Sequence, residues 1–211
     1  MDQVKLERRA AMAALLAGRG DDLLVIPGLG STAWDAASAG DNDRNFYLWG
    51  AMGGAAMIGL GLALAQPDCR VAVITGDGEM LMGLGSLATI GIQQPRNLAV
   101  IVFDNGVYGE TGMQPSHTQA GVDLIGVARG CGIASCLDVR DEKELADLAR
   151  RLQNLRETLF ARVQIAAEEP PRVLPLRDGV ALKNRFRVAI GIETRPVGAQ
   201  ERSGQCGFEP L

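Results

Sequence analysis

The chain has 211 residues, of which 47% are hydrophobic, and it carries a formal net charge of −4 at pH 7. This length and apolar content suit one domain of somewhat above typical size with an ample core. Because the net charge is negative and the lysines and arginines are scattered, the sequence has no basic field, and we expect no nucleic-acid partner.

The two ends of the chain and its cysteines further limit the class of protein. We expect an N-terminal helix within residues 1–20, where acids and bases interrupt any apolar core of a secretory signal. The four cysteines show no CxxC spacing, which argues against a zinc ribbon and gives no sign of a disulfide framework, so we expect a cytoplasmic protein. The polar, glycine-bearing stretch within residues 191–211 is expected to form a flexible tail or to pack on a partner.

Strand-like and helix-like segments alternate along the chain and predict one α/β domain over residues 21–190. The Ala51–Ala65 segment is apolar but shorter than the ~20 residues that span a bilayer, so we expect no membrane partner. Its glycines suggest close packing against another backbone. The alternation predicts a doubly wound, mainly parallel sheet with helices on both faces, whose ligands bind outside the carboxyl ends of the strands. The expected strands are Leu23–Ile26, Phe46–Leu48, Val71–Ile74, Leu98–Phe103, Ile133–Val139 and Leu159–Ile165, and the expected helices Thr32–Ala39, Ala51–Ala65, Glu79–Gly91, Gly121–Gly130, Glu142–Leu155 and Leu182–Ile190.

Two of these strands end in residues that can hold a metal against a diphosphate. Gly76-Asp77-Gly78 follows the Val71–Ile74 strand, and Asn105 follows the Leu98–Phe103 strand after twenty-six intervening residues. Magnesium prefers oxygen ligands in near-octahedral geometry and is usually held by one or two side-chain oxygens plus substrate phosphates. Asp77 supplies a charge and Asn105 a neutral oxygen, while an isolated Gly-Asp-Gly is also compatible with an ordinary turn at a strand end.

The fuller strings resemble a known family. Residues 76–89 read GDGEMLMGLGSLAT and residues 104–114 read DNGVYGETGMQ. They resemble the thiamine diphosphate signature, and in particular the diphosphate-binding domain of sulfopyruvate and phosphonopyruvate decarboxylases, over roughly residues 20–190. The resemblance implies thiamine diphosphate and Mg²⁺ as cofactors, with the metal held by Asp77, Asn105 and the backbone oxygen of Val107. It implies further cofactor contacts from Gly76, Gly78, Glu79, Tyr108 and Gly109.

A second glycine motif follows the first strand. Gly28-Leu29-Gly30-Ser31-Thr32-Ala33 matches a dinucleotide fingerprint with alanine in the last position. The acid expected about twenty residues further on is absent, which argues against a nicotinamide site. The same geometry can hold a phosphate through backbone amides, or can simply cap a helix with Ser31 as N-cap. In the resembled family this segment contacts the diphosphate, which assigns that role to Gly30, Ser31 and Thr32.

The loop Gly50-Ala51-Met52-Gly53 supplies a third element. In similar thiamine enzymes a bulky apolar residue here separates the two rings of the cofactor and enforces its bent form. Met52 is the candidate for this wedge, with Gly50 and Gly53 as neighbouring cofactor contacts, because methionine is long, unbranched and polarizable. Ordinary core packing is the alternative for Met52.

The resemblance also exposes what this chain lacks. In the family, the cofactor is activated by a glutamate on a separate pyrimidine-binding domain, and only about twenty residues precede the first strand here. The expected partner is therefore a pyrimidine-domain subunit that supplies the activating glutamate, within a dimer or higher oligomer. Glu79 is a weak internal substitute, since it follows the diphosphate-binding glycine and should point away from the aminopyrimidine.

Substrate recognition is expected in the loop from Tyr108 to Gln119, which carries His117, the single histidine. His117 is a candidate for anion binding or proton relay, and an exposed loop histidine is the alternative. Glu110 stands where relatives often have a small hydroxyl residue, and a carboxylate there disfavours a dianionic substrate. The leading hypothesis is a subunit of a decarboxylase of a small 2-oxo acid. Alternatives are a subunit of an acetolactate synthase-like carboligating enzyme or of a 2-oxo acid oxidoreductase, or a non-catalytic cofactor-binding subunit.

Overall fold

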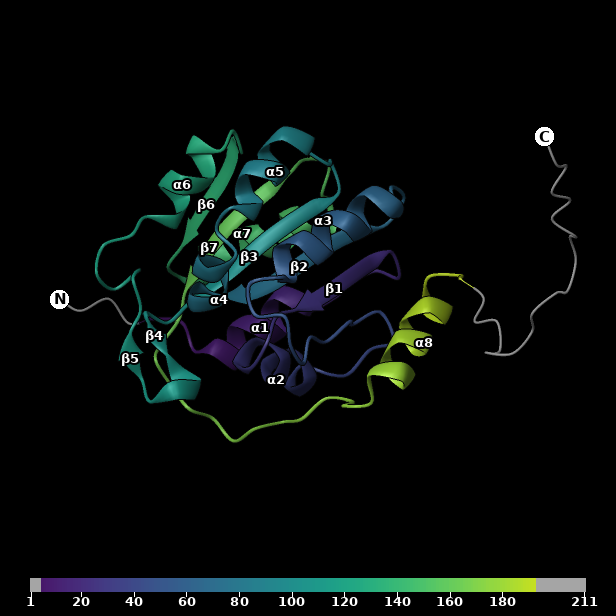
Figure 1. Ribbon diagram of the computed structural model, residues 1–211, viewed down its shortest axis with the longest axis horizontal. Coiled ribbons are helices and arrows are strands. Elements are labelled where there is room, and N and C mark those ends of the chain that lie inside the picture. The colour runs from purple at the N-terminus through teal and green to yellow at the C-terminus, as the bar shows by residue number, and fades with distance from the viewer. Residues whose placement is uncertain (1–4, 193–211) are drawn as a thin grey trace, which may run out of the picture.

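The computed structural model describes residues 5–192, which form a parallel five-stranded sheet between two layers of helices (Figure 1). The strand order is β1-β2-β3-β7-β6, so the chain crosses to the far edge after β3 and then returns to fill the gap. The predicted doubly wound parallel α/β fold is confirmed. The strands are β1 (Leu23–Pro27), β2 (Arg70–Gly76), β3 (Leu98–Asp104), β6 (Ser135–Val139) and β7 (Leu159–Gln164).

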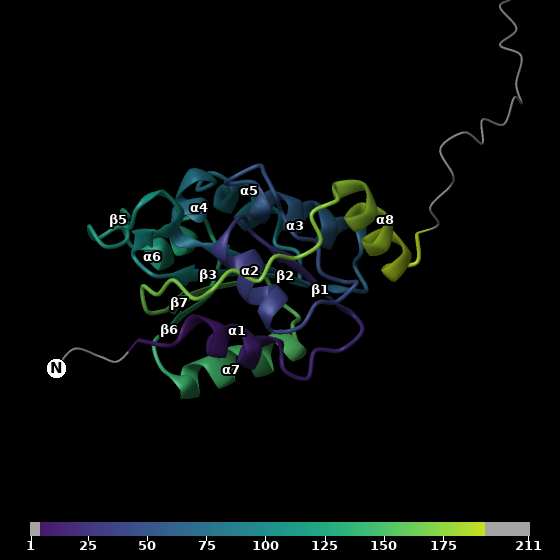
Figure 2. The same ribbon diagram turned by 90° about the horizontal axis from the view of Figure 1, so that it is seen from below.

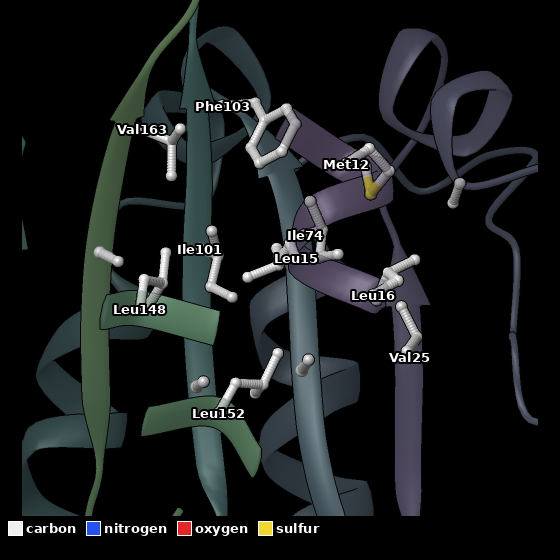
Figure 3. Close-up of a cluster of buried hydrophobic side chains, with 14 of the residues drawn as sticks. Met12, Leu15, Leu16, Val25, Ile74, Ile101, Phe103, Leu148, Leu152 and Val163 are labelled. Atoms are coloured by element: carbon white, nitrogen blue, oxygen red, sulfur yellow. The ribbon is translucent and has the colours of Figure 1, made fainter. Parts of the chain in front are cut away.

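Each face of the sheet buries its own hydrophobic core (Figure 2). Helices α1 (Arg8–Leu16), α2 (Ser31–Ser38) and α7 (Glu142–Gln153) cover one face. Figure 3 shows Met12 and Leu15 of α1 and Leu148 of α7 directed at Ile74 and Ile101 of the central strands. The other face is covered by α3 (Ala55–Ala65), α4 (Asp77–Met82), α5 (Ser86–Gln93) and α6 (Leu124–Gly130).

The remaining helix, α8 (Gly179–Ala189), lies beside the segment that follows α2. Its Phe186 ring packs 5.3 Å from the ring of Phe46, and its Arg185 forms an ion pair with Asp41 at 2.6 Å. The expected tail beyond residue 192, together with Cys206, lies outside the described residues. Within residues 5–192 no helix is both long and apolar enough to cross a membrane.

Several expected elements differ in detail. The Phe46–Leu48 strand is wrong, because this segment only runs along the outer edge of β1, where Asn45 forms an isolated bridge with Val25. The single helix expected over residues 79–91 is wrong, because the structure has two helices that are interrupted at Gly83. Any Cβ at Gly83 would lie 2.0 Å from the carbonyl oxygen of Gly53. The helix expected from Ala51 begins at Ala55, after a glycine turn. The polar loop after β3 contains a short hairpin, β4 (Val107–Tyr108) and β5 (Gln114–Pro115), with the 3₁₀ turn η1 (Gly109–Thr111) between them.

The glycines of α3 give a matched pair for testing how closely this helix packs on the sheet. A Cβ at buried Gly59 would lie 2.1 Å from Cγ2 of Val73 on β2, whereas exposed Gly61 has open space around it. We expect Gly59→Ala to lower the free energy of unfolding by about 1–3 kcal/mol through overpacking. Gly61→Ala should raise it by about 0.5–1 kcal/mol, because alanine favours the helix. Urea unfolding measures both, and equal effects would contradict the close approach.

Candidate functional site

The register of the sheet brings the two metal-site candidates together. Gly76 at the end of β2 pairs with Phe103 near the end of β3, so Asp77 and Asn105 leave neighbouring strands at the same edge. Both line a cavity of about 540 Å³ between the β1–α2 loop, α4 and the β4 hairpin. The predicted site residues that line this cavity are Ser31, Thr32, Met52, Gly76, Asp77, Gly78, Glu79, Asn105, Val107, Tyr108 and Gly109.

Asp77 is a buried acid with neutral partners. Its side chain accepts a hydrogen bond from Ser116, and the hydroxyl of Thr118 lies 3.1 Å from the same carboxylate oxygen and 2.8 Å from Oδ1 of Asp104. Burial raises the pKa of Asp77, and the charge of Asp104 adds to this, while the two hydroxyl groups offset part of the shift. A buried charge in such a position is relieved by a bound cation.

Asn105 turns the chain from β3 into the β4 hairpin. Its Oδ1 accepts a hydrogen bond from the amide of Val107 at 3.0 Å, which closes an Asx turn and fixes the side chain. The carboxylate and amide oxygens of Asp77 and Asn105 are hard ligands of the kind that Mg²⁺ prefers. Among residues 5–192, no group of three or more His, Cys, Asp and Glu side chains is arranged to hold a metal. The two side-chain oxygens of Asp77 and Asn105 fit a metal whose remaining ligands are backbone and phosphate oxygens.

The β1–α2 loop forms the opposite wall. Gly30, with φ of +79°, is the N-cap of α2 and Ser31 is its first residue, so the alternative with Ser31 as N-cap is wrong. The hydroxyl of Thr32 donates to the carbonyl of Gly28 at 3.0 Å and shapes the turn. No side chain caps α2. Its first amides are therefore available to an anion, as the resemblance predicts.

The side chain of Glu110 lies against the β1–α2 loop. A Cβ at Gly30 would lie 1.5 Å from Oε1 of Glu110, so the carboxylate rests against the loop that the resemblance assigns to the diphosphate. Glu110, which replaces the small hydroxyl residue that relatives often have at this position, thus lies directly beside the candidate cofactor site. A negative charge here opposes a second anion at the start of α2.

Met52 and His117 differ in their surroundings. Met52 is 47% exposed and lines the cavity, so it is not packed in the core. His117 is exposed and lies outside the cavity lining; its Nδ1 is 3.0 Å from the hydroxyl of Tyr108. The Tyr108 ring covers Gly78, where a Cβ would lie 2.5 Å from the ring. His117 therefore contacts the cavity lining through Tyr108.

Other predicted residues lie around the cavity, and some lining residues were not predicted. Gly30, Gly50 and Gly53 flank the cavity without lining it. The unpredicted Arg8 lines it from α1, buried and in an ion pair with Asp35 at 2.7 Å. Nothing local in the sequence marks Arg8, because it reaches the site only when α1 packs beside α2. Glu110, which the sequence placed near the substrate, also lines the cavity, and further lining residues not predicted from the sequence are Leu29, Met82, Phe103, Thr111 and Ile165.

Residues 30–163 match the family described as "Thiamine pyrophosphate enzyme, C-terminal TPP binding domain". The chain belongs to this family. It is 37% identical to the sulfopyruvate decarboxylase subunit beta of Methanocaldococcus jannaschii, over 81% of this chain and 90% of that subunit. It is 44% identical to the phosphonopyruvate decarboxylase of Streptomyces viridochromogenes, over 64% of this chain and 34% of that enzyme.

Solved structures of thiamine enzymes share the fold. A putative thiamin diphosphate-dependent enzyme from Mycobacterium smegmatis aligns with a TM-score of 0.66 at 19% identity, over 79% of this chain and 32% of the other. The matched part of this chain therefore spans nearly all of the beta subunit and about a third of each of the larger enzymes. The resemblance identified in the sequence is confirmed at the level of the family.

Proposed function

We propose that this chain is the diphosphate-binding subunit of a thiamine diphosphate- and Mg²⁺-dependent decarboxylase that acts on a small 2-oxo acid of the sulfopyruvate or phosphonopyruvate type. The observation that carries the proposal is the cavity where Asp77 and Asn105 face the uncapped start of α2. The names of the relatives support the reaction class.

Different residues of this cavity bind different parts of the cofactor. Asp77, Asn105 and the carbonyl of Val107 hold the metal, and the amides after Gly30 with Ser31 and Thr32 hold the diphosphate. The bound cofactor supplies an electron sink for the electrons released as carbon dioxide leaves. Met52 lines the cavity, where its flexible apolar side chain would serve as the wedge against the bound cofactor.

The activating glutamate comes from a partner chain in this proposal. Glu79 is buried under the β1–α2 loop and accepts hydrogen bonds there, so it is not free to reach an aminopyrimidine. Three of the sulfopyruvate decarboxylase relatives are named as beta subunits. Helix α3 consists only of apolar residues and glycine, yet Met57 and Leu64 on it are 44% and 51% exposed, which is typical of a face covered by another chain.

The experiment is purification of the tagged chain from its own cells, followed by a carbon dioxide release assay with Mg²⁺, thiamine diphosphate and a set of 2-oxo acids. We expect a stoichiometric partner and carbon dioxide release that needs both chains. Release of one carbon dioxide for every two oxo acids consumed, with a condensation product in place of an aldehyde, would favour a carboligating enzyme. Reduction of an added electron acceptor would favour a 2-oxo acid oxidoreductase. Cofactor binding without turnover in the complete complex would favour a non-catalytic cofactor-binding subunit.

The substrate set also tests the role of Glu110. Glu110→Ser removes the carboxylate beside Gly30. We expect it to lower the KM for a dianionic substrate such as sulfopyruvate by about tenfold relative to pyruvate, because a like charge near the site costs about 1 kcal/mol or more. The ratio of kcat/KM values for the two acids measures this. An unchanged ratio would place Glu110 outside substrate recognition.

We place the complex in the cytoplasm. Cys69, Cys131 and Cys136 are free thiols in the part of the chain that the structure describes. Free thiols of this kind are maintained in a reducing compartment. Fractionation of the native cells, with detection of the chain and its partner, tests this placement.

A further inference from the structure

Glu79 connects three segments that surround the candidate cofactor site. It follows the Gly76-Asp77-Gly78 motif on α4, and its side chain is 4% exposed. Oε2 accepts a hydrogen bond from the hydroxyl of Thr75 on β2 at 2.7 Å and another from the amide of Leu29 in the β1–α2 loop at 3.1 Å. Burial raises the pKa of this carboxyl group, and hydrogen bonding by Thr75 and by the backbone of Gly53 and Leu29 offsets part of the shift.

The surrounding backbone is shaped to admit this side chain. A Cβ at Gly28 would lie 1.9 Å from Oε2 of Glu79, so the loop passes the carboxylate at a distance that only glycine permits. The hydrogen bond from the Leu29 amide could not form if the loop moved outward by the width of a methyl group. The position of Glu79 therefore requires glycine at residue 28, beside Leu29, whose amide it binds from fifty residues further along the chain.

The second carboxylate oxygen is unusual. Oε1 of Glu79 is buried and has no hydrogen-bond partner among the described residues. Burying a polar oxygen without a partner costs free energy, so a residue kept in this state needs a compensating role. The hydrogen bond from the Leu29 amide to Oε2 provides one, because it holds the loop whose amides face the cavity.

We propose that Glu79 is a positioning residue that fixes the β1–α2 loop and thereby sets the affinity of this chain for the diphosphate of its cofactor. It acts through the amide of Leu29 and does not contact the reacting atoms. The inference rests on the proposed function for the identity of the ligand, while the loop-holding role concerns the unliganded chain. Loops that are ordered before binding lose less entropy when the ligand arrives, which raises affinity.

Three substitutions separate this role from others. Glu79→Gln keeps an acceptor for Thr75 and Leu29 and removes the charge. Glu79→Asp keeps the charge but withdraws the acceptor by one methylene, and Glu79→Ala removes both. Glu142→Ala, at an exposed position in the first turn of α7, is the matched control away from the site.

The readouts are hydrogen exchange of the peptide that contains Leu29, measured without ligand, and the Kd for thiamine diphosphate with Mg²⁺ by calorimetry. We expect Glu79→Ala and Glu79→Asp to accelerate exchange and to raise the Kd about tenfold, the size expected for one lost hydrogen bond to a charged group. Glu79→Gln should stay within about threefold, and Glu142→Ala should change neither readout.

Two results would overturn the proposal. If Glu79→Asp and Glu79→Ala exchange as slowly as the parent chain, Glu79 does not hold the loop. If exchange accelerates but the Kd is unchanged, the loop does not limit affinity. A parent chain that binds no thiamine diphosphate even with its partner would refute the proposed function instead, and the exchange of Leu29 would still show whether Glu79 holds the loop.

Discussion

Replacing Asp77 with asparagine is expected to abolish Mg²⁺-dependent binding of thiamine diphosphate while making the unliganded chain more stable. The Asp77 carboxylate is 2% exposed and faces Asp104 with only hydroxyl partners, so burial costs free energy until a cation arrives. Asparagine keeps the shape without the charge. We expect the melting temperature of the apo chain to rise by about 2–4 °C, equivalent to about 1 kcal/mol.

The effect on binding has the opposite sign and is larger. Removing a metal ligand should weaken cofactor binding by about 100-fold or more, since loss of an outer partner alone costs about 10–100-fold. Calorimetry with and without Mg²⁺ measures binding, and the ligand-induced rise in melting temperature gives an independent reading. Normal cofactor binding by Asp77→Asn would show that the metal assignment is wrong.

Asp138→Asn is the matched control, because Asp138 lies near the carboxyl end of β6 in the same sheet and has cationic partners. Burial opposes its charge, but hydrogen bonds from Arg162, Arg140 and Gln164 lower its pKa to about 2. A depressed pKa gives stability above the unfolded value of about 4, which is lost as the pH falls toward 2. Asp138→Asn should therefore lower the melting temperature at neutral pH, lose this effect near pH 2, and leave cofactor binding unchanged.

The second large effect is expected at the exposed apolar face beside the cavity. Met82 on α4 is 61% exposed and lines the cavity, and Met57 on the all-apolar α3 is 44% exposed. If a pyrimidine-domain subunit closes the site, these side chains become buried. Met82→Glu combined with Met57→Glu would then bury two unpaired charges, which we expect to weaken association by about 100-fold or more.

The variant should remain folded, because both side chains already contact water in the isolated chain. Analytical ultracentrifugation with the partner measures association, and circular dichroism measures folding. Val180→Glu, at a 65% exposed position on α8, provides a control of equal exposure and chemistry away from the cavity. A double variant that still assembles and releases carbon dioxide would place the partner on another face.

The sequence by itself determined the fold class and the two strand ends that carry the metal candidates. Continuous apolar runs such as Leu98–Phe103 bury both faces of a strand, and helical segments between them require parallel connections. In a parallel sheet the carboxyl ends of neighbouring strands meet at one edge, so Asp77 and Asn105 had to be close. Local pattern is enough for such conclusions because they follow from backbone geometry.

Only the tertiary structure decided which distant side chains reach the cavity. Arg8 enters it because α1 packs beside α2, and Glu79 points under the β1–α2 loop because Gly28 leaves room for it. The break between α4 and α5 likewise follows from the approach of Gly83 to the Gly53 backbone. These features depend on contacts between residues twenty-seven or more positions apart, and neither periodicity nor propensity carries that information, because both describe neighbours along the chain.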